Sequence, residues 1–153
     1  MIRLEHVTKS FGDHKVLDDV TIDVGEGTAF CLLGRSGTRK SVTLKHIIGL
    51  LHPDAGRVVV QGKDVSRLRG QELAGVRRSM GFLFQNSALF DSITVGENVA
   101  FPLRRHTDWD DRKIRDVAKA KLADVGLEKD FDKMPADLSG GMKKRAGLAG
   151  AMA

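Results

Sequence analysis

The chain has 153 residues, of which 41% are hydrophobic and 29% charged, a balance that supports a packed core and argues against intrinsic disorder. Its 25 Lys and Arg exceed its 20 Asp and Glu, but they form no dense basic block and aromatic residues are only 5%, so we expect no nucleic-acid partner. No apolar run approaches the about 20 residues that a membrane-spanning helix needs. The single cysteine, Cys31, excludes an internal disulfide framework.

The first half of the sequence predicts short strands and two helices. Apolar and polar residues alternate in the opening segments, whereas Ala29–Leu33 is a continuous apolar run, typical of a strand buried on both faces, in which Cys31 would be an inert core thiol. The predicted elements are strands at Arg3–Val7, Val16–Val24 and Ala29–Leu33, a helix at Ser41–Leu51, a strand at Val58–Val60, a helix at Gln71–Arg78 and a strand at Gly81–Phe84.

The second half is predicted to be all helical. Apolar residues recur at helical spacing in three segments, Val95–Leu103, Asp110–Val125 and Gly140–Met152. Gly126 is a candidate C-cap and Ser139 a candidate N-cap. The change of character predicts a nucleotide-binding part in residues 1–85 and a helical subdomain in residues 86–153.

A glycine-rich loop between a predicted strand and a predicted helix is a candidate phosphate-binding loop. The pattern G-x-x-x-x-G-K-[ST] is matched at Gly34, Lys40 and Ser41. Its backbone N–H groups would cradle the β- and γ-phosphates, Lys40 would neutralise the terminal phosphate, and the Ser41 hydroxyl would bind Mg²⁺. The alternative is a plain glycine-rich turn between strand and helix.

One position departs from that pattern, because Arg39 stands where the loop has glycine. Glycine lets the backbone approach the phosphates closely. If the position needs a positive φ, arginine adds on the order of 1–3 kcal/mol of strain. Its long side chain must also leave the pocket or occupy it. We therefore expect impaired ATP binding, although a positive charge beside phosphate is not itself unfavourable.

A second motif lies near the end of the chain, where Leu138–Met142 reads LSGGM. The chain also carries the glycine-rich loop, Gln85 at the end of an apolar run, and an opening segment that runs from Leu4 to Leu17. In the order and spacing of these motifs, the chain resembles the ATP-binding subunit of ABC transporters. The resemblance implies an α/β fold, a P-loop NTPase of the ABC type. It implies an antiparallel β subdomain, part of a parallel RecA-like core, and then a helical subdomain.

The resemblance also assigns roles to residues. Phe11 would stack on adenine; alternatively, Phe11 is a turn residue that covers the core. Gln85 would touch Mg²⁺ and the attacking water; alternatively, Gln85 is an ordinary polar residue of the surface. The signature residues, Ser139, Gly140, Gly141 and Met142, would close over ATP held by a second subunit, which implies a homodimer. The residues expected to bind ATP and Mg²⁺ are Phe11, Val16, Gly34, Arg35, Ser36, Gly37, Thr38, Arg39, Lys40, Ser41, Val42 and Gln85.

The segment from Phe84 to Thr107 narrows the resemblance to the ATPase of Mla-type phospholipid transporters. That resemblance implies a membrane permease and an MCE-type lipid-binding protein as partners. It also implies a cytoplasmic location, peripheral on the inner membrane through the permease. The apolar stretch Ala88–Phe90 would line the groove that receives the permease, or would belong to the ordinary core of the subdomain.

Several catalytic parts of the family lie downstream of its signature helix, and the chain ends at Ala153 before any of them. We therefore expect an N-terminal part of the subunit, nominate no general base, and expect no hydrolysis by this chain alone. We also expect it to aggregate when expressed alone, because the strand Ala29–Leu33 would expose an unpaired edge. A non-catalytic nucleotide-binding remnant and an importer ATPase with another cargo remain as alternatives.

Overall fold

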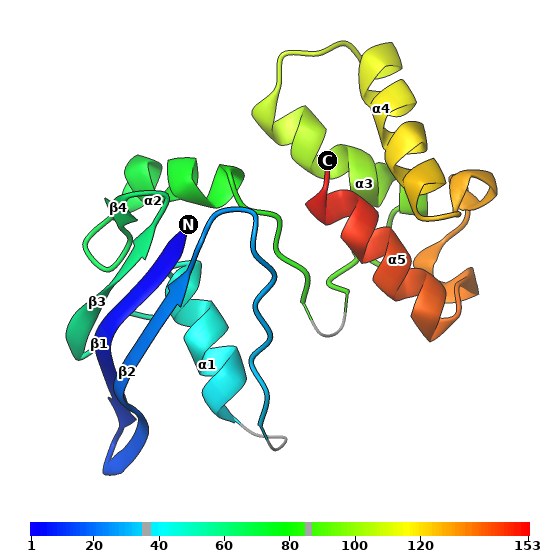
Figure 1. Cartoon of the computed structure of the whole chain (residues 1–153). Helices are drawn as coiled ribbons and strands as arrows, with labels where there is room; N and C mark the ends of the chain where they lie inside the picture. Colours follow the sequence, from blue (N-terminus) through cyan, green and yellow to red (C-terminus); the bar gives the residue numbers. More distant parts are fainter. Residues whose placement is uncertain (35–37, 85–86) are drawn as a thin grey trace. The chain divides into compact units, whose positions relative to one another are not determined.

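The computed structural model describes residues 1–34, 38–84 and 87–153. These residues form two compact units, Met1–Met80 and Gly81–Ala153 (Figure 1). The division falls a few residues before the boundary that the sequence suggests. Each unit has its own hydrophobic core, so each is described by itself.

The first unit is built on a four-stranded antiparallel sheet with the order β2-β1-β3-β4. Both strands predicted for the opening segment are present and are longer than the sequence pattern indicated. The strands are β1 (Ile2–Phe11), β2 (His14–Val24), β3 (Ala55–Val60) and β4 (Lys63–Asp64). The antiparallel β subdomain is therefore confirmed.

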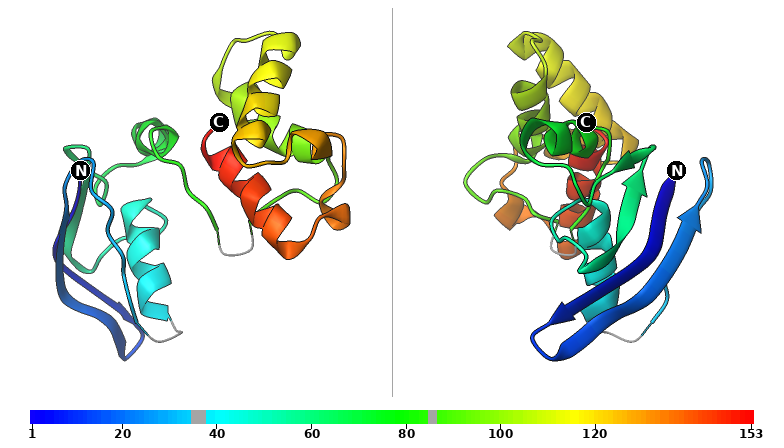
Figure 2. Two further views of the ribbon diagram at one scale, coloured as in Figure 1. Left: turned by 45° about the vertical axis from the view of Figure 1, so that its right-hand side comes forward. Right: turned by 90° about the vertical axis from the view of Figure 1, so that its left-hand side faces the viewer.

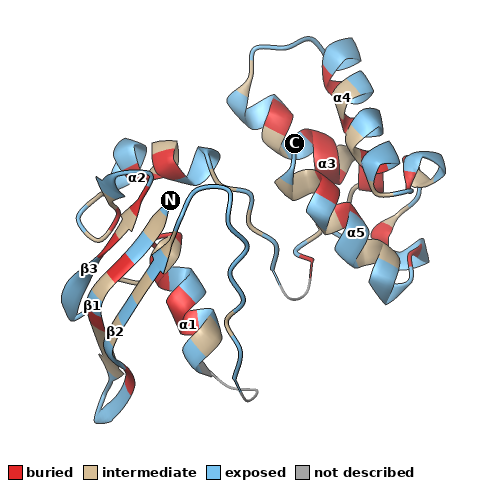
Figure 3. Cartoon of the chain, viewed as in Figure 1, coloured by how far each residue is buried: buried red, intermediate tan, exposed pale blue. Residues whose placement is uncertain are grey.

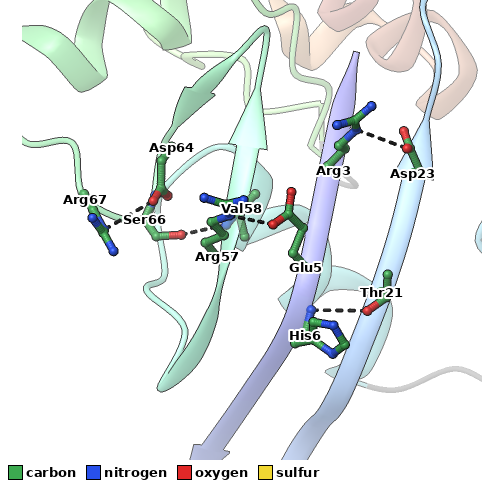
Figure 4. A network of polar contacts seen from close by, with 10 residues as sticks. All are labelled: Arg3, Glu5, His6, Thr21, Asp23, Arg57, Val58, Asp64, Ser66 and Arg67. Atoms are coloured by element: carbon green, nitrogen blue, oxygen red, sulfur yellow. Dashed lines mark hydrogen bonds and ion pairs between the residues drawn. The ribbon is translucent and has the colours of Figure 1, made fainter.

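The middle of β1 is irregular and closely packed. His6 and Asp19, on neighbouring strands, have positive φ angles of 51° and 48° where the β1–β2 register shifts. The His6 N–H donates to Thr21 Oγ1 at 3.2 Å (Figure 4). On the other side of β1, a Cβ at Gly56 would clash with the carbonyl oxygens of Glu5 and His6. Only glycine at position 56 therefore lets β3 lie this close to β1.

Exposed ion pairs bridge the strands of the sheet (Figure 4). Arg3 Nε lies 3.1 Å from Asp23 Oδ2 across the β1–β2 pair, and Arg57 bonds Glu5 across the β1–β3 pair. Exposed pairs of this kind contribute at most about 1 kcal/mol each. The sheet is therefore held mainly by its ladders and its buried face.

Two helices complete the first unit, α1 (Thr38–Ile47) and α2 (Gly70–Arg78). Helix α1 lies beside one face of the sheet in both views of Figure 2. Arg77 of α2 donates to the carbonyl oxygens of Ile48 and Gly49, both at 2.9 Å, and so joins α2 to the end of α1. Among the buried residues, red in Figure 3, those that form the hydrophobic core cluster of this unit are Leu4, Val7, Val16, Leu17, Val42, Val58, Val60, Val65, Leu73 and Val76.

Two predicted strands are wrong. Ala29–Leu33 and Gly81–Phe84 have no regular secondary structure, and Cys31 is exposed rather than buried in a strand. The Phe30 and Leu33 residues are 55% and 85% exposed. A strand buried on both faces needs hydrogen-bonded neighbours, and the described residues pair only within the β2-β1-β3-β4 sheet. An apolar run without such partners stays extended and open to solvent.

The second unit is helical, as predicted. Its helices are α3 (Val95–His106), α4 (Asp111–Asp124) and α5 (Gly140–Ala151), with short 3₁₀ turns at Glu128–Asp130 and Pro135–Asp137. The three helices pack around a core whose buried residues are Val95, Val99, Ala100, Leu103, Ile114, Ala118, Leu122, Leu127, Phe131, Leu138, Ala146 and Ala149. Gly96 is needed in α3 because a Cβ there would overlap the Phe131 ring.

Polar side chains define where these helices begin and end. Asp110 caps α4 by accepting from the Lys113 N–H at 2.7 Å, and Gly126, with φ of 69°, follows its last turn. Thr94 and Glu97 form a reciprocal capping box at the start of α3. Gly126 lies at the end of α4, as the sequence pattern indicated, whereas Asp110, expected as the first helical residue, is the N-cap.

A buried amide fixes the segment that leads into α3. Asn98 is 8% exposed, and its Oδ1 accepts from the Phe90 N–H at 2.7 Å. Its Nδ2 donates to the carbonyl oxygens of Phe90, Ile93 and Thr94 at 3.0, 3.3 and 2.9 Å. One side chain thus ties the backbone of three preceding residues to the helix, a role that no local sequence signal announces.

Candidate nucleotide-binding site

The described part of the phosphate loop consists of Gly34 and the first turn of α1. The first N–H groups of a helix have no partner within it, and its dipole adds partial positive charge, so this end is suited to an anion. The ammonium of Lys40 donates to the carbonyl oxygen of Gly34, which brings a cation back to the start of the loop. Arg35, Ser36 and Gly37 lie outside the described residues.

Arg39 is the second residue of α1. It therefore has helical backbone, and it is absent from the described residues with positive φ, so the strain considered for this position does not arise. Its side chain is exposed, and its carbonyl oxygen accepts from Thr43 Oγ1 at 3.0 Å. Any effect of Arg39 on a bound phosphate must come from the size and charge of its side chain.

The remaining α1 candidates divide between surface and core. Ser41 is exposed, so its hydroxyl is an available oxygen ligand of the kind Mg²⁺ prefers. Val42 is 7% exposed and Val16 is 5% exposed, and both pack in the core of the first unit. Thr38 contributes the first helical residue. The described residues therefore fit a triphosphate, with Ser41 as the one described candidate for the metal.

Phe11 ends β1 beside the turn that joins it to β2. Phe11 is 47% exposed, and Lys9 Nζ lies 5.6 Å from the centroid of the Phe11 ring. The β1–β2 turn and the first turn of α1 lie toward the same end of the unit in Figures 1 and 2. A residue this exposed leaves aromatic surface open to solvent at this end of the unit, which is what stacking on a base requires.

A carboxylate that sequence reasoning missed holds the strand beside Phe11. Asp54 Oδ1 accepts from Lys9 Nζ at 2.7 Å, and Oδ2 accepts from the Ser10 N–H at 2.7 Å. The Asp54 N–H donates to the Thr8 carbonyl oxygen at 2.9 Å. The bond from Lys9, followed by that from the Ser10 N–H, holds the pKa of Asp54 below its usual range.

The signature residues surround the beginning of α5. Ser139 is the N-cap, and its Oγ accepts from the Met142 N–H at 3.3 Å. A Cβ added at Gly140 or Gly141 would meet nothing within 4 Å, so this stretch presents open backbone. Met142 is half-buried against the core of the second unit. The motif therefore offers a capped helix N-terminus with exposed glycines, a geometry suited to an anion.

The segment before α3 divides between core and surface. Leu89 packs against the core, whereas Phe90 is 52% exposed and its ring centroid lies 5.0 Å from that of Phe101. Ala88 is exposed and has a positive φ of 48°. Gln85, which was expected at the metal, lies outside the described residues. Leu89 therefore belongs to the core of the second unit, whereas Ala88 and Phe90 are exposed and a groove that receives a permease stays a prediction.

Comparison with known proteins identifies the family. The family model for the "ABC transporter" domain matches residues 17–153. The chain belongs to this family. A probable ribonucleotide transport ATP-binding protein of Mycobacterium leprae is 47% identical over 99% of this chain and 44% of its own length. An intermembrane phospholipid transport system ATP-binding protein of Haemophilus influenzae is 41% identical over 100% of this chain and 58% of its own length.

Solved structures of the family agree with the fold. A dimeric ATP-binding cassette in a post-hydrolysis state, bound to ADP and Pi, superposes with a TM-score of 0.91 at 31% identity, covering 99% of this chain and 69% of that one. This confirms the predicted fold class. The chain spans about half the length of the curated relatives it matches. No helix within the described parts of this ABC family member is long and apolar enough to cross a membrane.

Proposed function

We propose that this chain is the nucleotide-binding part of an ABC transporter subunit that couples ATP hydrolysis to phospholipid transport. The observation that carries the proposal is the start of α1, where the Lys40 ammonium folds back onto the Gly34 carbonyl oxygen at the N-terminal end of the helix. The relative from Haemophilus influenzae, whose name specifies intermembrane phospholipid transport, aligns with the entire chain and so supports phospholipid as the cargo.

In this proposal, each described residue has a limited task. The N–H groups of α1 and the Lys40 ammonium hold the phosphates, while the exposed Phe11 ring stacks on adenine. Ser41 is the described residue that would hold Mg²⁺, which would neutralise charge developing on the phosphates; the same role for Gln85, outside the described residues, rests on the family resemblance alone. Phosphoryl transfer depends mostly on such positioning and charge stabilisation. We assign no general base to this chain.

The proposed assembly is a homodimer joined to a permease. The open backbone at Gly140 and Gly141 would contact ATP held by the second subunit. The permease would place the subunit at the cytoplasmic face of the inner membrane, with an MCE-type lipid-binding protein as a further partner. The dimeric state of a solved relative supports the homodimer.

Reconstitution of the subunit with its permease in phospholipid vesicles tests the proposal. We expect ATP-dependent transfer of a labelled phospholipid, which the Lys40→Ala variant should abolish. Lys45→Ala is the matched control, because Lys45 is an exposed lysine in the last turn of the same helix. Transport of methionine or a ribonucleotide without phospholipid transfer would contradict the lipid assignment.

Two alternatives have their own support. A methionine import ATP-binding protein of Leifsonia xyli is 41% identical over 99% of this chain, which favours an importer with another cargo. Arg39 in the phosphate loop favours a non-catalytic remnant that binds nucleotide weakly. Nucleotide binding without any ATPase activity in the permease complex would select the remnant.

A further inference from the structure

The loop after α1 is fastened to β1 immediately before Phe11. Asp54 bonds to three successive residues of the strand, through its N–H to Thr8, through Oδ1 to Lys9 and through Oδ2 to Ser10. We infer that Asp54 is a positioning residue that holds the Phe11 ring where it stacks on the base of a bound nucleotide. The inference rests on the proposed function, since it presumes that Phe11 contacts adenine.

The contacts are those expected of a positioning device. Both carboxylate oxygens of Asp54 are used, each at 2.7 Å, and bonds to a charged acceptor are stronger than neutral ones. The Lys9 side chain is only 17% exposed, so its ammonium is held more firmly than a surface lysine. That ammonium also faces the Phe11 ring, 5.6 Å from its centroid. Asp54 therefore constrains the strand on one side of Phe11 and, through Lys9, the position of the ring itself.

The same segment reaches both ends of the proposed site. Helix α1 begins at the phosphate loop, and the loop that follows it carries Asp54. Arg77 bonds to the carbonyl oxygens of Ile48 and Gly49, which fixes the start of that loop. The element that presents N–H groups to the phosphates is thus continuous with the residue that fixes the ring for the base.

The structural alternative is that Asp54 merely tethers a loop. A tether would support the entire unit, so its loss would weaken the binding of every ligand. A positioning residue for Phe11 would matter only for ligands that carry a base. Inorganic triphosphate has the phosphates of ATP and no base, so comparing these two ligands separates the roles.

Isothermal titration of ATP and of inorganic triphosphate, each with Mg²⁺, into the full chain tests the inference. We expect Asp54→Ala to weaken ATP binding by roughly tenfold, the scale of one lost base–aromatic contact, and to leave triphosphate affinity within about twofold. Phe11→Ala should give the same pattern. In a Phe11→Ala background, Asp54→Ala should cause no further loss of ATP affinity, because residues that act through one contact are not additive.

Two further variants keep the test independent of folding. Asp54→Asn retains an acceptor for the Ser10 N–H and loses the charge toward Lys9, so an intermediate loss of ATP affinity is expected. Asp23→Ala breaks the exposed pair with Arg3 at the opposite end of the same strand pair and should change neither affinity. Thermal melting of each variant confirms that it is folded.

The outcomes separate failure of the inference from failure of the proposed function. Equal losses for ATP and triphosphate in Asp54→Ala, or a further loss in the Phe11→Ala background, would overturn the positioning role while nucleotide binding stands. Wild-type chain that binds neither ligand, with Lys40→Ala indistinguishable from it, would overturn the proposed function and the inference together.

Discussion

At the scale of single residues, Arg39 has a different consequence from the one its place in the motif suggested. It is helical and unstrained, so only its side chain can hinder a phosphate. We expect Arg39→Gly to tighten ATP binding severalfold while lowering the free energy of unfolding by about 1 kcal/mol, since glycine weakens a helix. Titration and chemical denaturation measure the two effects.

Arg39→Ala is the control for that substitution. It removes the side chain and keeps a good helix former, so its ATP affinity should match that of Arg39→Gly without the loss of stability. ATP affinity equal in the wild type and both variants would show that Arg39 does not impair binding.

The site residues show which kinds of information a sequence holds. Gly34, Lys40 and Ser41 are predictable because a phosphate loop is one local stretch with fixed spacing. The role of Asp54 was not predictable, because its partners Ser10 and Lys9 lie 44 and 45 positions earlier in the chain and no local pattern encodes that pairing. The sequence interpretation thus indicated the phosphate end of the candidate site and omitted the contact beside Phe11.

At the scale of elements, the link between Asn98 and its preceding segment governs how α3 begins. Asn98→Asp would place a carboxylate oxygen against three carbonyl oxygens and remove the side-chain donor from those of Phe90 and Ile93, whereas that of Thr94 still accepts from the residue's own backbone N–H. We expect the second unit to lose at least about 1–3 kcal/mol of stability, the cost of unsatisfied buried groups. Asp116→Asn, an exposed exchange on α4, should change stability by less than about 0.5 kcal/mol. Urea denaturation compares the two, and equal effects would contradict the role of Asn98.

The capping box of α3 makes the same unit sensitive to acid. The bond from the Thr94 N–H, followed by the contact with the Thr94 side chain, holds the pKa of Glu97 below its ordinary 4.5. The ionised form is thus favoured in the folded state, so its stabilisation is present above pH 4.5 and is lost as the pH falls through the lowered pKa. Glu97→Gln should lack this decline, which unfolding curves across that pH range would reveal. Parallel decline in both proteins would contradict the assignment.

Elements were predictable where their signals are local. Helix α4 lies within one residue of the predicted bounds, because the spacing of its apolar residues is contained in one stretch. The segment Ala29–Leu33 has an equally apolar pattern, yet it is not a strand. A strand requires neighbours supplied by distant segments, so apolar composition alone does not determine its structure.

At the scale of the molecule, exposed apolar segments dominate the expected behaviour in solution. We expected aggregation from an unpaired strand edge, but the exposed feature is irregular chain, with Phe30 at 55% and Leu33 at 85% exposure. We expect the double substitution Phe30→Ser and Leu33→Ser to reduce aggregation measured by light scattering. Leu50→Ser, at a leucine outside that segment that is 48% exposed, should have little effect. A monodisperse wild-type monomer with one cooperative melt would contradict this expectation.

Each of the two units is made from one uninterrupted stretch of chain, divided at Met80. All residues of the first core are therefore translated before the first residue of the second core. Domains generally fold as units, the N-terminal one first during synthesis. The sheet and its glycine contact at position 56 can thus form while the helical unit is still being made. The order of translation then separates two apolar cores that would otherwise collapse at the same time.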